Sequence, residues 1–275
     1  MQSPDSSLSP AYDAPRHDRY ASLPLAYIEL HSHCNRDCPF CPRFHDRSGR
    51  RKDVHGEPVI ARMPTDKVYL LLDQLAAGGY RGEIGLFHNS DPFLDKRYLQ
   101  FARYAVARGM RLRENTNGDV LRSNLVLCEQ LDGLISILTI GLYDYSTHSE
   151  KLKEMEFWRS IFKKTEIRFS TPYENLNPRQ FAETYTWLFK DERMLDVPCQ
   201  YRRDYLFVAY DGTAVLCCQD DYGAFGLGNI FEDGIDHVLF STKRKMINDI
   251  LDRPSGRRKF DLCSKMNRSI SIFIK

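Results

Sequence analysis

YIELHSHCNRDCPFC, residues 27–41, joins a short apolar run to a polar loop that carries three cysteines. These are Cys34, Cys38 and Cys41, in the spacing Cys-x3-Cys-x2-Cys. Three thiolates can hold three irons of a [4Fe–4S] cluster, which normally takes four cysteines. The fourth iron would then keep an open coordination position, and such a position separates a reactive metal centre from a structural one. The segment therefore predicts a reactive iron–sulfur centre directly after a strand.

The rest of the chain places this loop in an α/β fold. Apolar runs predict strands, and amphipathic stretches between them predict helices. Repeated strand–helix units imply parallel strands with right-handed crossovers. The cysteine loop leaves the carboxyl end of the first strand, which is where active sites of parallel barrels lie. The predicted strands span residues 26–30, 84–87, 111–116, 134–140 and 166–170.

The pattern changes near Pro198, where a second group of cysteines begins. Two runs, 205–210 and 213–217, flank Asp211-Gly212 and predict a β-hairpin. A helix is expected over 235–251. A free cysteine is often simply a core residue, and we expect this of Cys128. Four cysteines that lie close together in the sequence beside turns instead favour metal binding. The four are Cys199, Cys217, Cys218 and Cys263.

Composition narrows the classes of function. The net charge is +2, so a strongly basic nucleic-acid-binding surface is not expected. No apolar run is long enough to span a bilayer, and the amino terminus has no apolar signal core. We therefore expect a cytoplasmic protein without membrane or nucleic-acid partners, in which eight cysteines serve metal or redox chemistry. We predict a disordered tail over 1–21, a barrel over 22–195 and a second module over 196–275.

The motifs resemble the radical S-adenosylmethionine (radical SAM) superfamily over roughly residues 25–266. The resemblance implies a partial (β/α)6 TIM-like barrel with a [4Fe–4S] cluster on Cys34, Cys38 and Cys41. It also implies that SAM chelates the open iron and is cleaved to a 5′-deoxyadenosyl radical. Phe40, just before the third cysteine, would pack near the adenine. A reductant such as flavodoxin or ferredoxin would supply the electron, and the basic segment 42–62 is a candidate docking site or a solvated loop.

Further SAM-binding residues follow from the resemblance. The family usually has a Gly-Gly-Glu-Pro type segment after the second strand, where this chain has Asn89, Ser90 and Asp91 before a proline. Asp91 would accept from the methionine ammonium. Asn117 belongs to a Thr-Asn-Gly segment like that of the family. Arg168 in the fifth strand would either pair with the methionine carboxylate of SAM or lie on the surface.

Two details of the barrel and module depart from the family. Gly141 stands where the family often has a serine at the end of the fourth strand. The second module resembles the auxiliary-cluster modules called SPASM and Twitch, of which the single-cluster Twitch form fits best. Such modules often end in Cys-x2-Cys. In this chain the first cysteine would be Cys263, but Met266 stands in the place of the second. There are three alternatives for the fourth coordination position of the auxiliary cluster: the thiolate of Cys218, an open iron, or the thioether of Met266. If Cys218 is not a ligand, we expect it to be a buried thiol. The predicted ligands are Cys199, Cys217 and Cys263.

The resemblance includes single-auxiliary-cluster dehydrogenases of aminoglycoside synthesis. It therefore favours an oxidoreductase of natural-product biosynthesis that acts on a small polar metabolite, such as a sugar or aminocyclitol. A peptide-modifying enzyme, an epimerase or cross-linking maturase, is the second interpretation, and Cys218 would then be a candidate hydrogen donor. A zinc-stabilised binding protein is the non-enzymatic one, with Cys3His ligands completed by His31, His33 or His45.

Overall fold

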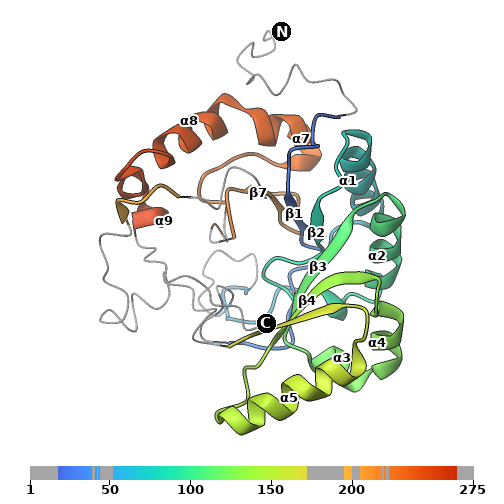
Figure 1. Cartoon of the computed structure of the whole chain (residues 1–275). Helices are drawn as coiled ribbons and strands as arrows, with labels where there is room; N and C mark the ends of the chain where they lie inside the picture. Colours follow the sequence, from blue (N-terminus) through green and yellow to red (C-terminus); the bar gives the residue numbers. More distant parts are fainter. Residues whose placement is uncertain are drawn as a thin grey trace.

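The centre of the computed structural model is a seven-stranded sheet in the order β5-β4-β3-β2-β1-β6-β7 (Figure 1). The structure describes residues 18–38, 41, 43, 52–171, 195–199, 205–218, 220 and 223–264. Five strands come from the predicted barrel, and each is hydrogen-bonded in parallel to its neighbours. They are β1 (Leu25–Ile28), β2 (Glu83–Gly85), β3 (Arg111–Thr116), β4 (Ile135–Gly141) and β5 (Glu166–Ser170).

Helices follow the strands and pack on the outer side of the sheet (Figure 1). Alternate residues of β1 and the chain after it, Ala26, Ile28 and Leu30, are fully buried and belong to the core cluster shared with the apolar face of α1. Cys128 is also fully buried in this core, which confirms its predicted role. The helices are α1 (Thr65–Ala77), α2 (Tyr98–Ala107), α3 (Asp119–Ser123), α4 (Leu125–Leu131) and α5 (His148–Ile161), with a short 3-10 turn η4 (Pro92–Leu94).

The predicted hairpin forms, but it belongs to the barrel sheet as well as to the second module. β6 (Tyr205–Val208) pairs antiparallel with β7 (Ala214–Val215) and parallel with β1, with Ala26 opposite Leu206. The sheet therefore runs through the boundary that we predicted at residue 195. The stretch 172–194 lies outside the described residues.

The second module contributes helices that lie above the hairpin in the view of Figure 1. The single helix predicted over 235–251 is two helices in the structure. They separate at Ser241, whose hydroxyl accepts a hydrogen bond from the Arg244 amide and so caps the second one. The elements are α7 (Ile230–Phe240), α8 (Thr242–Leu251), the 3-10 turn η6 (Gly256–Lys259) and α9 (Asp261–Ser264).

Residues 18–21 were assigned to the disordered tail, but they are folded against both parts of the chain. The Tyr20 amide donates to the Gly78 carbonyl after α1, over 2.6 Å. Its hydroxyl donates to Asp236 of α7, also over 2.6 Å, and its ring stacks on Phe240. In the part of the chain that the structure describes, no helix combines the length and apolar character needed to span a membrane.

Candidate iron–sulfur and cofactor site

The three-cysteine loop lies at the carboxyl end of β1, as predicted. Cys34, Cys38 and Cys41 are half-buried, and the Cys41 amide donates to the Cys38 carbonyl over 2.9 Å. All eight cysteines are among the described residues, and none forms a disulfide. Burial raises the pKa of Cys34 and raises that of Cys38 to about 11, with Cys34 adding to the second shift. A bound metal would have to displace these protons, because the thiolate and not the thiol is the ligand. Phe40 lies outside the described residues.

The basic segment after this loop folds back onto it where it is described. The Ser32 hydroxyl accepts from the Ala61 amide over 2.9 Å, and the Ser32 amide donates to the Ala61 carbonyl. Lys52 forms an ion pair over 2.7 Å with Asp37, which lies between Cys34 and Cys38 in the sequence. Lys52 and Ala61 therefore connect this segment to the cluster loop, while residues 53–58 are exposed to solvent.

His31 is buried, and both of its ring nitrogens are engaged. Its Nδ1 accepts from the His33 amide over 3.1 Å, so Nε2 carries the proton and donates to the Asp91 carbonyl over 3.0 Å. Burial lowers the pKa of His31, which agrees with a neutral ring. A ring held in this way has no nitrogen left for zinc. Among the described residues no three His, Cys, Asp or Glu side chains are grouped closely enough to bind one ion, and this applies to the three loop cysteines as much as to a Cys3His set. His45 lies outside the described residues.

Asp91 is buried and holds two strand ends together. One carboxylate oxygen accepts from the Thr116 hydroxyl over 2.7 Å and from the Asn117 amide over 3.0 Å. The other accepts from the Phe93 amide over 3.2 Å and caps η4. Burial raises the pKa of Asp91, and the three hydrogen bonds oppose the shift. Three of the roughly four acceptor positions of this carboxylate are thus used within the protein, and its contact with an ammonium stays a prediction.

The two residues before Asp91 offer better contacts for a cofactor. Ser90 is buried, and its hydroxyl has no hydrogen-bond partner among the described residues. The backbone of Asn89 is fixed, because its amide donates to the buried Glu29 carboxylate over 2.9 Å. An unsatisfied buried hydroxyl beside the cluster loop fits a polar cofactor group that would complete its bonding. These residues therefore fit the predicted SAM site.

Arg168 lies in the middle of β5, and Gly141 ends the neighbouring strand β4. Arg168 is half-buried on β5 and pairs with Glu166 over 2.8 Å, opposite Thr139 of β4. A Cβ atom at Gly141 would lie 2.2 Å from the ring of Tyr143. A serine at this position would therefore require the Tyr143 ring to move.

The inner face of the sheet carries an aromatic group that the sequence analysis missed. The ring of Tyr27 lies over Gly85, where a Cβ would approach it within 2.4 Å. It stacks on Phe207 and meets Phe87 edge-on, each at 5.0 Å between centroids. Arg113 lies on the same face and pairs with Glu83 over 2.7 Å. Inward-facing alternation along the strands was the available signal.

Two of the four auxiliary cysteines, Cys199 and Cys263, lie on segments that the fold brings together. Cys217 and Cys263 are buried, whereas Cys199 and Cys218 are half-buried. The Cys199 amide donates to the Leu251 carbonyl at the end of α8, and Cys263 lies on the nearby α9. Asp220, also missed in the sequence, is buried and accepts from the Leu216 and Ala224 amides, which shapes the loop around Cys217. Met266 lies outside the described residues.

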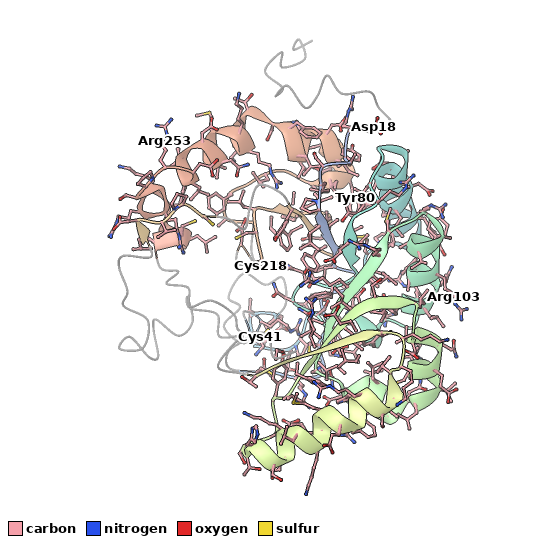
Figure 2. The ribbon with its side chains drawn as sticks, viewed as in Figure 1. Asp18, Cys41, Tyr80, Arg103, Cys218 and Arg253 are labelled. Atoms are coloured by element: carbon pink, nitrogen blue, oxygen red, sulfur yellow. The ribbon has the colours of Figure 1, made fainter. Side chains whose placement is uncertain are left out.

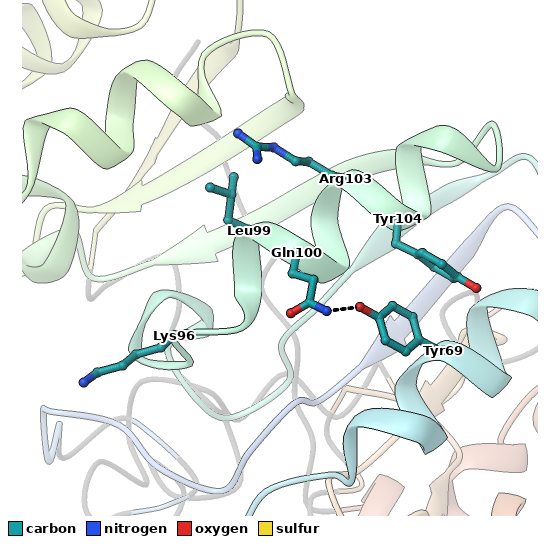
Figure 3. Close-up of a pocket in the computed structure, with 6 residues that line it drawn as sticks. All are labelled: Tyr69, Lys96, Leu99, Gln100, Arg103 and Tyr104. Atoms are coloured by element: carbon teal, nitrogen blue, oxygen red, sulfur yellow. Dashed lines mark hydrogen bonds between the residues drawn. The ribbon is translucent and has the colours of Figure 1, made fainter.

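Both cysteine groups open toward the same side of the molecule. Figure 2 shows Cys41 and Cys218 on the side of the sheet opposite α1 and α2. Burial raises the pKa of the Tyr27 hydroxyl, and Cys218 is near enough to add to this shift. Cys218 thus approaches the inner face of the sheet. A separate pocket lies on the outer side between α1 and α2, lined by Tyr69, Lys96, Leu99, Gln100, Arg103 and Tyr104 (Figure 3).

Comparison with known proteins identifies the second module. The family model SPASM, an iron–sulfur cluster-binding domain, matches residues 199–265. The chain contains a SPASM domain. This confirms the predicted iron–sulfur character of the module, while the narrower Twitch assignment stays a prediction. No curated protein matches the SPASM-domain chain in sequence.

Solved structures support the fold of the whole SPASM-domain protein. The structure of BtrN in complex with AdoMet and 2-DOIA is 19% identical, with 91% of this chain and 98% of that chain covered and a TM-score of 0.66. The structure of BtrN in an open conformation is 20% identical, with 90% of this chain and 94% of that chain covered and a TM-score of 0.62. Streptococcus suis SuiB bound to precursor peptide SuiA gives 10% identity, 91% and 76% coverage and 0.51. At these identities the likeness shows the fold alone.

Proposed function

We propose that this SPASM-domain protein is a radical SAM oxidoreductase that acts on a small polar substrate. The observation that carries the proposal is the position of the cysteine loop. Cys34, Cys38 and Cys41 offer three thiols at the carboxyl end of a parallel strand, beside the unsatisfied hydroxyl of Ser90. Three cysteines leave one iron of a [4Fe–4S] cluster without a protein ligand.

The residues around this loop suit the binding of SAM. The Ser90 hydroxyl and the Asn89 side chain would contact its polar groups, and Phe40 would contact its adenine. Asp91 would act indirectly, because its carboxylate fixes the backbone at Asn117. When bound, the cluster and SAM supply a radical that takes a hydrogen atom from the substrate. The chain's own residues bind, orient and shield the reacting groups.

The inner face of the sheet favours a small polar substrate. Tyr27 is partly exposed on this face and stacks on the buried Phe207, so its ring offers the C–H groups of a sugar or cyclitol a fixed apolar contact. Asn115 on the central strand β3 is exposed, and the Arg113–Glu83 pair adds donors and acceptors nearby. Mixed aromatic and planar polar side chains of this kind are typical of sites for polar ligands.

Oxidation of an alcohol needs a route for one electron and one proton. Loss of a hydrogen atom from the carbon is followed by loss of the hydroxyl proton and of one electron, which gives a ketone. The cluster of the SPASM domain would accept that electron, and Cys199, Cys217 and Cys263 are its proposed ligands. Cys218 is the proposed fourth ligand. A flavodoxin or ferredoxin would supply the first electron.

A peptide-modifying activity is the second candidate, since the SuiB structure bound to precursor peptide SuiA shares the fold. Cys218 would then serve as a hydrogen donor at the inner face. The two proposals differ in redox outcome. A dehydrogenase removes two hydrogens from its product, whereas an epimerase leaves the mass of its product unchanged in ordinary water.

The test uses anaerobically reconstituted full chain with SAM, a one-electron reductant and a panel of aminocyclitols and sugars. Mass spectrometry should detect 5′-deoxyadenosine together with a product two mass units lighter. With substrate deuterated at the carbinol carbon, one deuterium should appear in 5′-deoxyadenosine. Cys38→Ala is the matched inactive control. Absence of 5′-deoxyadenosine from the fully iron-loaded protein would exclude radical SAM chemistry altogether.

A further inference from the structure

Arg36 lies between two of the predicted cluster ligands and binds two carboxylates at once. Its Nε donates to Asp119 over 2.7 Å, and a terminal nitrogen donates to the other oxygen of the same carboxylate. Its two terminal nitrogens donate to Asp144 over 2.9 and 2.7 Å. The Arg36 side chain is 20% exposed. A guanidinium that is bidentate to two carboxylates uses almost all of its donors.

The two carboxylates come from different strand ends. Asp119 is the first residue of α3 and directly follows the Thr-Asn-Gly segment that ends β3. Asp144 follows β4, next to Tyr143, whose ring centroid is 6.0 Å from the Arg36 guanidinium carbon. Arg36 therefore joins the middle of the cluster loop to the carboxyl ends of two parallel strands. The proposed SAM site lies at these same strand ends.

A second contact strengthens the same connection. The side-chain amide of Asn35 donates to Asp119 over 2.7 Å, so two successive loop residues share one carboxylate. The Arg36 hydrogen bonds hold the pKa of Asp119 below its usual range, which keeps the carboxylate charged near neutral pH. Lysine could not reproduce this geometry, because an ammonium has no planar fork to bind two carboxylates.

We infer that Arg36 is a positioning residue, which fixes the cluster loop against the ends of β3 and β4 before any cofactor binds. The inference deepens the proposed function, since it assigns to Arg36 the placement of the open iron relative to SAM. A fully exposed ion pair would contribute little to stability, and its loss would leave the position of the loop unchanged. The Arg36 side chain is 20% exposed and Asp119 is 37% exposed, whereas Asp144 is 63% exposed, so the bidentate contact with Asp119 should carry most of the effect.

The first test uses iron-free protein and so does not depend on the reaction. Amide hydrogen exchange of residues 34–38 should be about tenfold faster or more in Arg36→Lys, as expected for loss of at least one charge-assisted hydrogen bond. Asp144→Asn removes one partner only and should give a smaller increase. Arg108→Lys is the matched control, because Arg108 pairs with Asp73 under the ring of Tyr104 on the outer helices. It should leave the cluster loop unchanged.

The second test uses iron-loaded protein. Arg36→Lys should keep its full iron content but raise the KM for SAM about tenfold, with kcat changed less than the KM. The spectral change that SAM causes in the reduced cluster should need correspondingly more SAM. Unchanged loop exchange and unchanged KM in Arg36→Lys and Asp144→Asn would overturn the inference. If the wild type does not cleave SAM, the proposed function fails, while loop exchange still decides whether Arg36 positions the loop.

Discussion

The side-chain amide of Asn117 donates a hydrogen bond to the sulfur of Cys34, with 3.8 Å between nitrogen and sulfur. The same nitrogen donates to the side-chain oxygen of Asn35 over 2.9 Å. The amide oxygen of Asn117 accepts from the Asp119 backbone, also over 2.9 Å. These two contacts fix the orientation of the amide, with its NH2 group toward the sulfur. Asn117 was predicted from the sequence as a cofactor contact, and this geometry adds a contact to a cluster ligand.

Replacing Asn117 by leucine should make the reduction potential of the N-terminal cluster more negative. A donor to a ligand sulfur stabilises the extra negative charge of the reduced cluster, so its loss favours the oxidised form. One weak hydrogen bond of about 0.5–1 kcal/mol corresponds to roughly 20–40 mV for a one-electron couple. An EPR-monitored redox titration measures the shift. An unchanged potential at full iron content would show that this hydrogen bond does not tune the cluster.

The two cysteine groups should have separable effects. Replacing Cys34, Cys38 or Cys41 by alanine should abolish formation of 5′-deoxyadenosine, because each removes one of three ligands. Replacing Cys199 or Cys217 should spare cleavage of SAM but abolish product, since the SPASM domain would then lack its cluster. Cleavage of SAM by Cys38→Ala would contradict the site assignment.

Iron analysis provides the control for this cysteine series. The wild type should hold about 7–8 irons per chain if both clusters are cubanes, and each ligand variant about half as many. Cys128→Ala should keep the full iron content, because Cys128 is a buried core residue. A colourless wild type with stoichiometric zinc would instead support the binding-protein interpretation.

The sequence predicted local features of this chain better than its non-local ones. β3 and β5 cover the residues expected from their apolar runs, and the cysteine loop follows β1 as its spacing indicated. The pairing of β6 with β1 was not predicted, because no local pattern shows which strand a hairpin will join. Asp91 shows the same limit at the site. Its position in the motif was visible, but its hydrogen bonds to Thr116 and Asn117 depend on the approach of two strand ends.

The stability of the protein should fall as the pH rises through the titration of Glu114. This carboxyl is buried and accepts from the Leu86 amide and the Tyr98 hydroxyl, each over 3.0 Å. Burial raises the pKa of Glu114 from 4.5 to about 8. Between these values the folded state keeps a proton that the unfolded state loses. Stabilisation present at low pH is therefore lost toward pH 8, with a slope of at most about 1.4 kcal/mol per pH unit.

Glu114→Gln tests this dependence, because glutamine is neutral at every pH and still accepts both hydrogen bonds. Urea unfolding of iron-free protein between pH 5.5 and 8.5 should show a shallower loss of stability in the variant than in the wild type. The buried His31, whose lowered pKa acts in the opposite direction, contributes below its ordinary pKa of 6.5. It therefore affects the acid end of the range. Parallel pH profiles of the two proteins would contradict the assignment to Glu114.

Removal of the Tyr20 ring should destabilise the contact between the barrel and the SPASM domain. The ring is buried against Gly78, where a Cβ would lie 2.2 Å from it, and it stacks on Phe240 of α7. Tyr20→Ala should lower the free energy of unfolding by about 3–5 kcal/mol, as for other buried aromatic residues. Tyr20→Phe keeps the ring and loses only the hydrogen bond to Asp236, so its cost should be about 1 kcal/mol.

The matched control is Tyr104→Phe, which removes a similar tyrosine–aspartate hydrogen bond on the outer helices. Its cost should be smaller than that of Tyr20→Phe, because surface substitutions are usually within about 0.5 kcal/mol. Urea unfolding of the iron-free chain measures all three variants. If Tyr20→Ala costs no more than Tyr104→Phe, the N-terminal segment does not hold the SPASM domain to α1. A large cost confined to Tyr20→Ala would instead show that ring packing, more than the hydroxyl contact, joins the two parts.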